Sequence, residues 1–417
     1  MVGTGDVVEL EVVAVAHGGH CVARLPDDDD GGRGRVVFVR HTLPGERVRA
    51  RLTEAAPEAR YWRADAEEVL VASPDRVPAA WTEAGPGGVG GGELSHVALP
   101  AQRAWKAAVV AEQLSRLAGV ERDVVVEAAP GDDARGGLAW RTRIELSVDA
   151  QGRAGMTRSR THDVVPLASM PLAHEALDSL GLFARRWPRG ARLEAVAPSA
   201  GEPLVLVDGV PFRGGKPDTR PNARTSVTEL VRVGGTEHRY RVAGRGFWQV
   251  HREAPGVLVA AVLEAAGDVD GARVLDLYSG AGLLTVPLAH AVGSGGSVLA
   301  VEGDARAVKD ARRNVHGLAH VTLEEGEVAR TLVGSAGRLA ADVVVLDPPR
   351  QGAGRTVAAA VAATGARRVV YVACDPAALA RDVAYLEGHG YALGGVRAFD
   401  LFPMTHHVEC VAVLDRA

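Results

Sequence analysis

The sequence predicts an α/β fold in which a doubly wound parallel sheet follows a small β-barrel and a mixed, β-rich middle region. From about residue 241, apolar strand-like runs alternate with helix-like segments, which is typical of a parallel sheet covered by helices. Residues 1 to about 70 instead show short alternating strands, and a Pro/Gly-rich stretch at 73–95 follows them. We therefore expect three parts, at residues 1–70, 71–240 and 241–417.

The first part has the strand pattern of a small, OB-like barrel. "DVVELEVVAVA" alternates, "RGRVVFVRHTLPGERVRARLTE" gives two strands around a Pro-Gly turn, and "YWRADAEEVLV" gives another. "LPDDDDGGRG" is expected as a polar loop between them. Residues 99–119 carry helical periodicity and are expected to form a helix that can pack with the C-terminal part, whereas 120–240 give weaker strand signals.

Composition excludes several classes of protein. The formal net charge is −5 over 417 residues, so no overall basic field indicates a nucleic-acid partner, although a local patch is enough for binding. Three cysteines cannot build a disulfide framework, which favours a reducing, cytoplasmic compartment. The N-terminus has acids where a signal peptide needs Lys or Arg, and no long apolar run predicts a membrane span. No obligate protein partner is evident, and we expect a monomer.

A glycine-bearing turn follows the first strand of the parallel sheet. In "VLDLYSGAGLLTVPLA", Gly280 and Gly282 let the backbone turn tightly and approach a ligand. The pattern is neither a dinucleotide fingerprint nor a P-loop. Glu302 ends the next strand, where an acid can accept hydrogen bonds from both ribose hydroxyls. Together these features favour an S-adenosylmethionine pocket; the alternative is a tight turn with an incidental acid.

The next strand ends in "DVVVLDPPR", which places Asp347 before two prolines. Asp-Pro-Pro forms a rigid, pre-set lip, and a purely structural turn is the alternative. Methyltransferases that act on exocyclic amines often carry an aromatic residue after such a motif. Arg350 stands there instead, which makes amine methylation less favoured.

Cys374 lies at the C-terminal end of the following strand, where open α/β sheets bind their ligands. A free cysteine is usually a small buried apolar residue. Beside a methyl donor, however, a thiolate that adds to C6 of a pyrimidine makes C5 nucleophilic enough to accept a methyl group. A base must then remove the C5 proton so that the thiolate can leave.

Glu409 is the candidate base. It stands in "DLFPMTHHVECVAVL", with His406 and His407 close by, and a carboxylate in so apolar a strand is costly without a task or a partner. An exposed acid on an edge strand is the alternative. We expect Cys410 to be buried packing and Cys21 to be incidental to the barrel.

Taken in order, these motifs resemble the S-adenosylmethionine-dependent RNA 5-methyluridine (uracil-C5) methyltransferases over nearly the whole chain. "LPGERVRARL" looks like part of a TRAM domain, the small RNA-binding barrel of many such enzymes. "GFWQVH" resembles the family's aromatic-Gln motif and "LDLYSGAG" its donor loop. "LDPPRQG", "ACDP" and "FPMTHHVE" match the family's Asp-Pro-Pro-Arg, nucleophile and base motifs.

The resemblance implies a class I methyltransferase domain with a Rossmann-like sheet, an RNA substrate, either tRNA or rRNA, and formation of 5-methyluridine. It implies that Cys374 is the nucleophile and Glu409 the base. Cofactor or base contacts are implied for the following residues: Gln249, Tyr278, Gly280, Glu302 and Asp347. The barrel arginines at 40, 47, 49, 51, 60 and 63 would hold the RNA backbone, or would form an ordinary solvated face, since acids are interspersed.

The middle region departs from the resemblance. Several members of the family carry a four-cysteine iron–sulfur cluster there, but the corresponding positions appear as Ala79, Val89, Gly92 and Met170. With no thiolate to ligate iron, we expect no cluster and no other metal. Ser279, which replaces a common cysteine of the donor loop, is expected to be harmless.

Three alternatives remain open from the sequence. RNA 5-methylcytosine enzymes carry a Pro-Cys in the Asp-Pro motif, whereas position 349 is Pro followed by Arg350, which favours uracil. A non-catalytic RNA-binding or RNA-folding protein would not need both Cys374 and Glu409. A methyltransferase acting on a small molecule or a protein would not need this cysteine chemistry.

Overall fold

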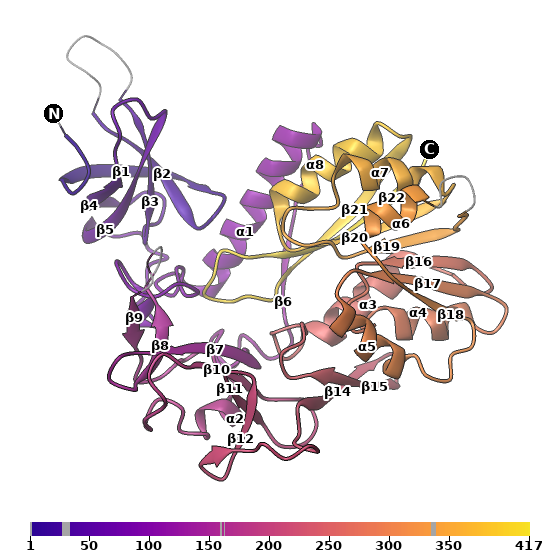
Figure 1. Cartoon of the computed structure of the whole chain (residues 1–417). Coiled ribbons are helices and arrows are strands. Elements are labelled where there is room, and N and C mark those ends of the chain that lie inside the picture. Colours follow the sequence, from indigo (N-terminus) through magenta and orange to yellow (C-terminus); the bar gives the residue numbers. More distant parts are fainter. Residues whose placement is uncertain (1, 27–33, 159–160, 162, 335–338) are drawn as a thin grey trace.

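The computed structural model describes residues 2–26, 34–158, 161, 163–334 and 339–417. The central residues of the expected polar loop, 27–33, lie outside the described part of the chain. Figure 1 shows an N-terminal barrel, a middle sheet and a C-terminal sheet covered by helices. The predicted α/β fold, with a barrel before it and a β-rich middle region, is confirmed.

The barrel closes in the order β1-β2-β3-β5-β4. Alternation drives this closure, since β4 turns Val48, Ala50 and Leu52 inward and its other side chains outward. The strands are β1 (Val7–Ala16), β2 (His20–Arg24), β3 (Val36–Arg40), β4 (Arg47–Glu54) and β5 (Tyr61–Val71).

The middle sheet has the order β13-β12-β11-β10-β7-β8-β9, and a separate hairpin, β14–β15, follows it. Its strands are β7 (Arg143–Val148), β8 (Ala154–Thr157), β9 (Val164–Pro166), β10 (Arg192–Val196), β11 (Leu204–Val207), β12 (Val210–Arg213) and β13 (Lys216–Pro217). The hairpin comprises β14 (Ser226–Val233) and β15 (Thr236–Ala243), and two short helices are η1 (Thr82–Ala84) and α2 (Glu175–Asp178).

Of the four positions that correspond to cysteines of the iron–sulfur cluster, Val89, Gly92 and Met170 are buried, whereas Ala79 is exposed. Val89 and Met170 pack into the same buried cluster as Trp81. A Cβ atom on Gly92 would lie 2.7 Å from a ring carbon of Trp81, so this backbone has no room for a cysteine side chain. The tryptophan therefore occupies space beside the position where a thiolate would stand.

The C-terminal sheet has the order β18-β17-β16-β19-β20-β22-β21-β6. The strands from β18 to β20 run parallel, whereas β22 runs antiparallel to both β20 and β21. Their bounds are β6 (Val126–Ala128), β16 (Arg273–Leu277), β17 (Ser297–Glu302), β18 (Val321–Glu325), β19 (Val343–Leu346), β20 (Arg368–Ala373), β21 (Tyr391–Asp400) and β22 (Glu409–Arg416).

Helices cover both faces of this sheet, which explains the continuous apolar character of its strands. On β16, Val274 joins one buried cluster and Leu275 the other. The first cluster contains residues of α3 (Ala254–Ala266) and α4 (Thr285–Val292), and α5 (Ala305–Asn314) lies beside β15 and β18. The second contains residues of α6 (Val328–Gly334), α7 (Gly354–Ala363) and α8 (Pro376–Glu387).

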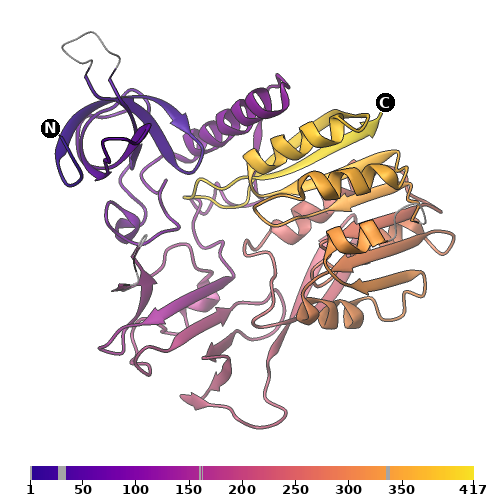
Figure 2. The same cartoon turned by 45° about the horizontal axis from the view of Figure 1, so that its top comes forward.

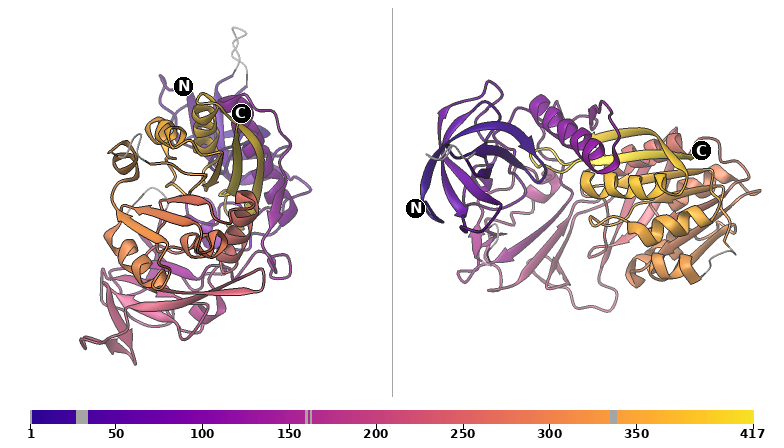
Figure 3. Two further views of the ribbon diagram at one scale, coloured as in Figure 1. Left: turned by 90° about the vertical axis from the view of Figure 1, so that its right-hand side faces the viewer. Right: turned by 90° about the horizontal axis from the view of Figure 1, so that it is seen from above.

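Helix α1 (Leu99–Gln113), continued by the π-helical turn η2 (Leu114–Ala118), lies between the barrel and the C-terminal sheet (Figures 2 and 3). It packs against α8, and its buried Lys106 donates to Asp400 at 2.5 Å and to the carbonyl of Phe402 at 3.0 Å. Strand β6 then pairs in parallel with β21. The C-terminal sheet thus includes a strand from the first third of the chain.

Candidate active site

The sheet gathers most of the sequence-predicted site residues on one edge. Glu302 ends β17, Tyr278 follows β16, Asp347 follows β19 and Cys374 follows β20. Glu409 opens β22, whose antiparallel direction brings its first residue to the same edge. Strands β16 and β19 lie between β17 and β20. With neighbouring strands about 4.8 Å apart, the ends of β17 and β20, where Glu302 and Cys374 lie, are roughly 14 Å apart.

Cys374 and Glu409 lie opposite each other. Ala373 of β20 pairs with Cys410 of β22, so the next pair in this antiparallel register is Cys374 with Glu409. Directly opposite residues point to the same face of a sheet. Cys374 is half-buried, and burial together with the nearby carboxyl of Glu409 raises the pKa of its thiol to about 12.

Glu409 is not the exposed edge-strand acid of the alternative interpretation. It is 3% exposed, and burial together with Asp347 raises its pKa well above the usual range. Burial, with the carboxyl of Asp276 beside it, also raises the pKa of Asp347 to about 7. The carboxyl groups along this edge therefore disfavour one another's ionisation.

Asp276 lies beneath the glycine-bearing turn and is fully buried. Thr285 Oγ1 donates to Asp276 Oδ2 at 2.5 Å, whereas Asp276 Oδ1 is buried without a hydrogen-bond partner among the described residues. Burial raises the pKa of this carboxyl to about 7. An unpartnered buried acceptor at this position indicates a ligand or a bound water above the turn.

The turn itself is held by Glu302. The N–H of Gly280 donates to Glu302 Oε2 at 2.8 Å, and the N–H of Asp304 donates to Oε1 at 2.7 Å. Gly280 has a φ of 56°, which glycine adopts without strain, but Tyr278 has a φ of 62°. A tyrosine in the left-handed region stores strain, and such residues concentrate at binding sites.

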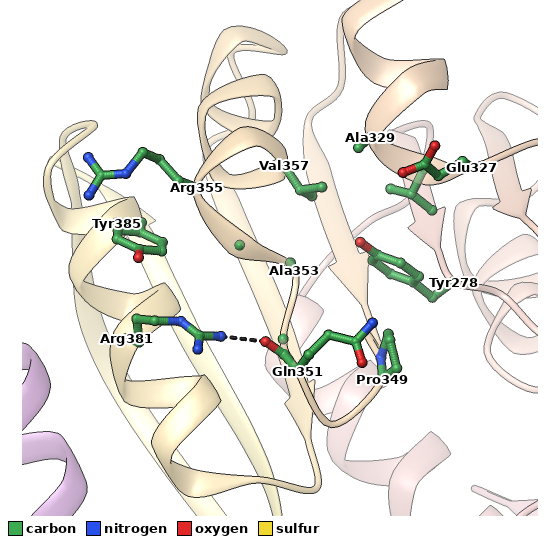
Figure 4. A pocket seen from close by; sticks show the side chains of 13 residues that line it. Tyr278, Glu327, Ala329, Pro349, Gln351, Ala353, Arg355, Val357, Arg381 and Tyr385 are labelled. Carbon is green, nitrogen blue, oxygen red and sulfur yellow. Dashed lines mark hydrogen bonds between the residues drawn. The ribbon is translucent and has the colours of Figure 1, made fainter.

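A cavity of about 520 Å³ opens beside Tyr278 (Figure 4). Glu327 and Val328 at the start of α6 line it, together with Pro349 from the loop after β19. Its walls combine apolar and aromatic surface with the carboxylate of Glu327 and the guanidinium groups of Arg355 and Arg381. The carboxylate can accept a hydrogen bond from an exocyclic amine. Glu327 carries no distinctive sequence signal, because an acid before a short helix is too common to stand out.

These features fit S-adenosylmethionine. Several carboxyl groups lie close together at the edge and raise one another's pKa, so a cationic ligand is favoured there, and the donor carries a positive sulfonium and an ammonium group. The cavity beside Tyr278 is large enough for a purine, and a contact of Glu302 with ribose hydroxyls stays a prediction. The residues present therefore suit the group that the sequence predicts.

Gln249 lies outside the strand ends that carry the other predicted residues. It is buried in the segment after β15, where the neighbouring Val250 accepts hydrogen bonds from Thr142. Two residues before Gln249, Phe247 exposes 71% of its surface. So large an exposed aromatic beside a predicted cofactor residue is a candidate surface for a base, and the sequence analysis did not assign it a separate role.

The loop from 401 to 408, which leads into Glu409, is held from several sides. Met404 N donates to Gln102 Oε1 at 2.8 Å, and Leu94 N donates to the carbonyl of Met404 at 2.9 Å. His406 contacts Glu93, whose pKa falls to about 2 because that imidazole is its hydrogen-bond partner. None of these contacts is visible as a sequence motif.

His407 stands between this loop and the Asp-Pro-Pro-Arg lip. Burial lowers the pKa of His407 to about 3, so its neutral ring can accept a hydrogen bond from Arg350 Nη2 at 3.2 Å. Arg350 in turn lowers the pKa of Cys374, against the larger effects of burial and the carboxylates. Arg350, whose presence after the two prolines makes amine methylation less favoured, thus lies beside the predicted nucleophile.

The barrel arginines are largely neutralised by acids of the same barrel. Ion pairs join Arg40 to Asp65 at 2.7 Å, Arg49 to Glu68 at 2.8 Å and Arg51 to Glu67 at 2.6 Å. Arg47 and Arg63 have acidic partners as well, in Glu9 and Glu54. A role for these side chains in holding the RNA backbone stays a prediction, and it requires that phosphates displace these partners.

Comparison with known proteins decides the family. The family model for tRNA (uracil-5-)-methyltransferases matches residues 222–417, and the TRAM domain model matches residues 2–66. The chain is 44% identical to an uncharacterized RNA methyltransferase of Streptomyces coelicolor, over 99% of this chain and 93% of that protein. It is also 44% identical to one from Bifidobacterium longum, over 98% of this chain and 96% of that protein.

The chain belongs to this family of RNA methyltransferases. It is an S-adenosylmethionine-dependent enzyme whose C-terminal domain is of the uracil-C5 type and whose barrel is a TRAM domain, as the sequence predicted. A solved tRNA (uracil-54, C5)-methyltransferase of Pyrococcus abyssi, in complex with S-adenosyl-L-homocysteine, shares the fold of the methyltransferase described here. The TM-score is 0.69 at 22% identity, covering 97% of this chain and 100% of that one.

None of the described helices is long and apolar enough to cross a membrane.

Proposed function

We propose that this RNA methyltransferase forms 5-methyluridine in tRNA or rRNA, with Cys374 as the nucleophile and Glu409 as the base. The observation that supports this assignment is the register of β20 and β22, in which the two side chains are opposite each other. They lie at the sheet edge where S-adenosylmethionine is proposed to bind. We further propose that the enzyme acts in the cytoplasm, because the three cysteines favour a reducing compartment. We also propose that it acts as a monomer.

Cys374 begins the reaction as a thiolate that adds to C6 of the uracil, so that C5 becomes enolate-like. S-adenosylmethionine, bound along the same edge, supplies an electrophilic methyl group for C5. The thiol of the free enzyme is held protonated by its acidic, half-buried surroundings. Arg350 opposes that effect, and in this proposal it is the group that favours the thiolate once the target uracil has entered the site.

Glu409 completes the reaction by accepting the C5 proton. The C5–H bonding pair then forms the C5–C6 double bond, the bond between Cys374 Sγ and C6 breaks, and the thiolate is restored. The raised pKa of Glu409 makes its carboxylate a strong base once it is ionised. Its burial also keeps water away from the proton that it removes.

In this proposal, the remaining predicted residues hold S-adenosylmethionine and the target uracil. Glu302 and the Gly280 turn bind the ribose, Tyr278 and Glu327 border the purine, and Asp347 lies between the donor and the target base. Gln249 contacts the donor from the other side. A target uridine in folded RNA must be unstacked into this site, at a cost of about a few kcal/mol, and the exposed ring of Phe247 is placed to stack on bases.

One denaturing gel tests the two assignments. With a labelled methyl donor and RNA that lacks the modification, Glu409→Gln should accumulate a covalent protein–RNA adduct that carries the methyl group, because the C5 proton cannot leave. Cys374→Ala should form no adduct and no product, yet should bind the donor within a few-fold of the wild type. The double variant should also form no adduct.

Other outcomes point elsewhere. Normal turnover by Cys374→Ala would remove the cysteine from the mechanism. Folded Glu409→Gln that turns over at a near-normal rate would mean that the base is another residue, and His407 would be the next candidate. A purely structural Glu409 predicts lower stability with residual turnover in proportion to the folded fraction, and no adduct.

A further inference from the structure

The turn between β1 and β2 of the TRAM barrel, residues 17–19, lies against the catalytic domain. His17 Nε2 is 3.2 Å from Oδ2 of Asp375, the residue after Cys374. At Gly19, a Cβ atom would lie 3.1 Å from Cγ of Glu93 and 3.2 Å from Cβ of His406. The turn therefore contacts both the loop that carries the proposed nucleophile and the loop that leads to the proposed base.

The backbone of this turn suits close contact. Gly18 and Gly19 have φ angles of 86° and 76°, in the region where other residues are strained. A side chain at position 19 would also crowd the pair formed by Glu93 and His406. Both the conformation and the space thus require glycine where the barrel meets the base loop.

Asp375 is the link between His17 and the nucleophile. Its Oδ1 accepts from Ala378 N at 2.8 Å, which caps the N-terminus of α8, and its Oδ2 faces His17. Because both of its oxygens have partners, the carboxylate of Asp375 is fixed in orientation. The backbone that joins Cys374 to α8 passes through Asp375, so it is held as well. Loss of the His17 contact would free one side of this short loop.

We propose that His17 is a positioning residue, through which the TRAM barrel holds the Cys374 loop in the conformation that attacks the uracil. This inference rests on the proposed role of Cys374. It assigns the barrel a part in the chemical step, separate from any part in binding RNA. Because a small misplacement of a reacting group slows its attack by tenfold or more, the effect belongs in kcat.

The contact depends on charge. The hydrogen bond to Asp375 raises the pKa of His17, and Glu112 of α1 contributes in the same direction. These two acids are the charged groups that face the imidazole. His17 is therefore cationic below its raised pKa and loses its charge as the pH rises through that value, which weakens its hold on Asp375.

The test compares full-length variants. His17→Ala removes the contact, whereas His17→Gln keeps an N–H donor at the position of Nε2 but cannot titrate. Val13→Thr is the matched control, because Val13 lies on the same strand β1 and is 65% exposed. For each variant, kcat and KM are measured between pH 6.5 and 9 with RNA that lacks the modification.

We expect His17→Ala to lower kcat by about tenfold while KM for RNA stays within about twofold. His17→Gln should recover most of the rate, and its kcat should lack the decline at high pH that His17 contributes to the wild-type enzyme. Val13→Thr should match the wild type. Thermal unfolding of each variant shows whether it is folded, and if His17→Ala is not, the pH profile of His17→Gln still decides.

Two results would overturn the inference. A raised KM with an unchanged kcat would make the turn an RNA-binding element only, and unchanged kinetics in a folded His17→Ala would make the contact incidental. Cys374→Ala, assayed in parallel, separates this inference from the proposed function. If that variant is inactive while His17→Ala is normal, the nucleophile assignment stands and only the role of His17 fails.

Discussion

At the scale of single residues, the surroundings of Cys374, the proposed nucleophile, favour its unreactive thiol form. Burial and the carboxyl groups of Glu409 and Asp347 favour the thiol form of Cys374, and Arg350 is the opposing influence. Cys21 and Cys410 are fully buried, so Cys374 is the cysteine that a water-soluble reagent reaches first. This difference makes the protonation state of Cys374 measurable.

We predict that alkylation of Cys374 by iodoacetamide accelerates about tenfold for each pH unit up to at least pH 9, because the reactive thiolate fraction rises in that proportion below the pKa. Arg350→Gln should be alkylated several-fold more slowly at each pH, since it lacks the cation that favours the thiolate. Mass spectrometry of the labelled peptide gives the rates. A plateau near pH 8 would show instead that the thiol is already activated without RNA.

The sequence predicted the residues of the sheet edge because each belongs to a local pattern. A buried strand that ends in an acid, a glycine turn or a cysteine identifies its own strand end, and parallel strands bring such ends together. The contacts of His17 with Asp375 and of Arg350 with His407 join residues far apart in the chain. Such pairs follow no periodicity, and they become visible only when the domains are placed in space.

At the scale of elements, helix α1 holds the loop that precedes Glu409, the proposed base. Lys106 is fully buried and pairs with Asp400 at the end of β21, while Gln102 binds the backbone of Met404. The helix was expected from its periodicity, but the sequence did not reveal that two polar residues on its buried side hold the loop before Glu409.

We predict that Lys106→Met lowers the free energy of unfolding by about 3–5 kcal/mol, because it leaves the carboxylate of Asp400 buried and unpaired. The double variant with Asp400→Leu should recover much of that loss, since neither charge then remains. Denaturant unfolding of the four proteins in this cycle measures the coupling. Equal destabilisation by the single and the double variants would contradict an ionic role for the pair.

At the scale of the whole molecule, the middle region has apolar packing at positions where the resemblance would place cluster cysteines. Trp81, Val89 and Met170 share one buried cluster. The three cysteines lie in the barrel, after β20 and within β22, so they do not form a four-thiolate site. Within the described part of the chain, no three His, Cys, Asp or Glu residues are grouped so that they could hold a metal ion.

We therefore predict that protein purified without oxygen is colourless and contains far less than one iron atom per chain, and that chelators leave its thermal stability unchanged. Iron analysis and the visible absorption spectrum provide the measurement. About one cluster per chain, with an absorption band that is lost on oxidation, would contradict this expectation.

The pairing of β6 with β21 has a consequence for the order in which the protein is made. Glu127, the central residue of β6, and Arg397 of β21 are joined by an ion pair although they stand 270 positions apart. During synthesis β6 leaves the ribosome long before β21, so it has no partner strand until nearly the whole chain has emerged. Unpaired strand edges promote aggregation in unfinished chains. Because β6 has only three residues, the strand edge that stays unpaired until β21 is made is short, which limits that hazard.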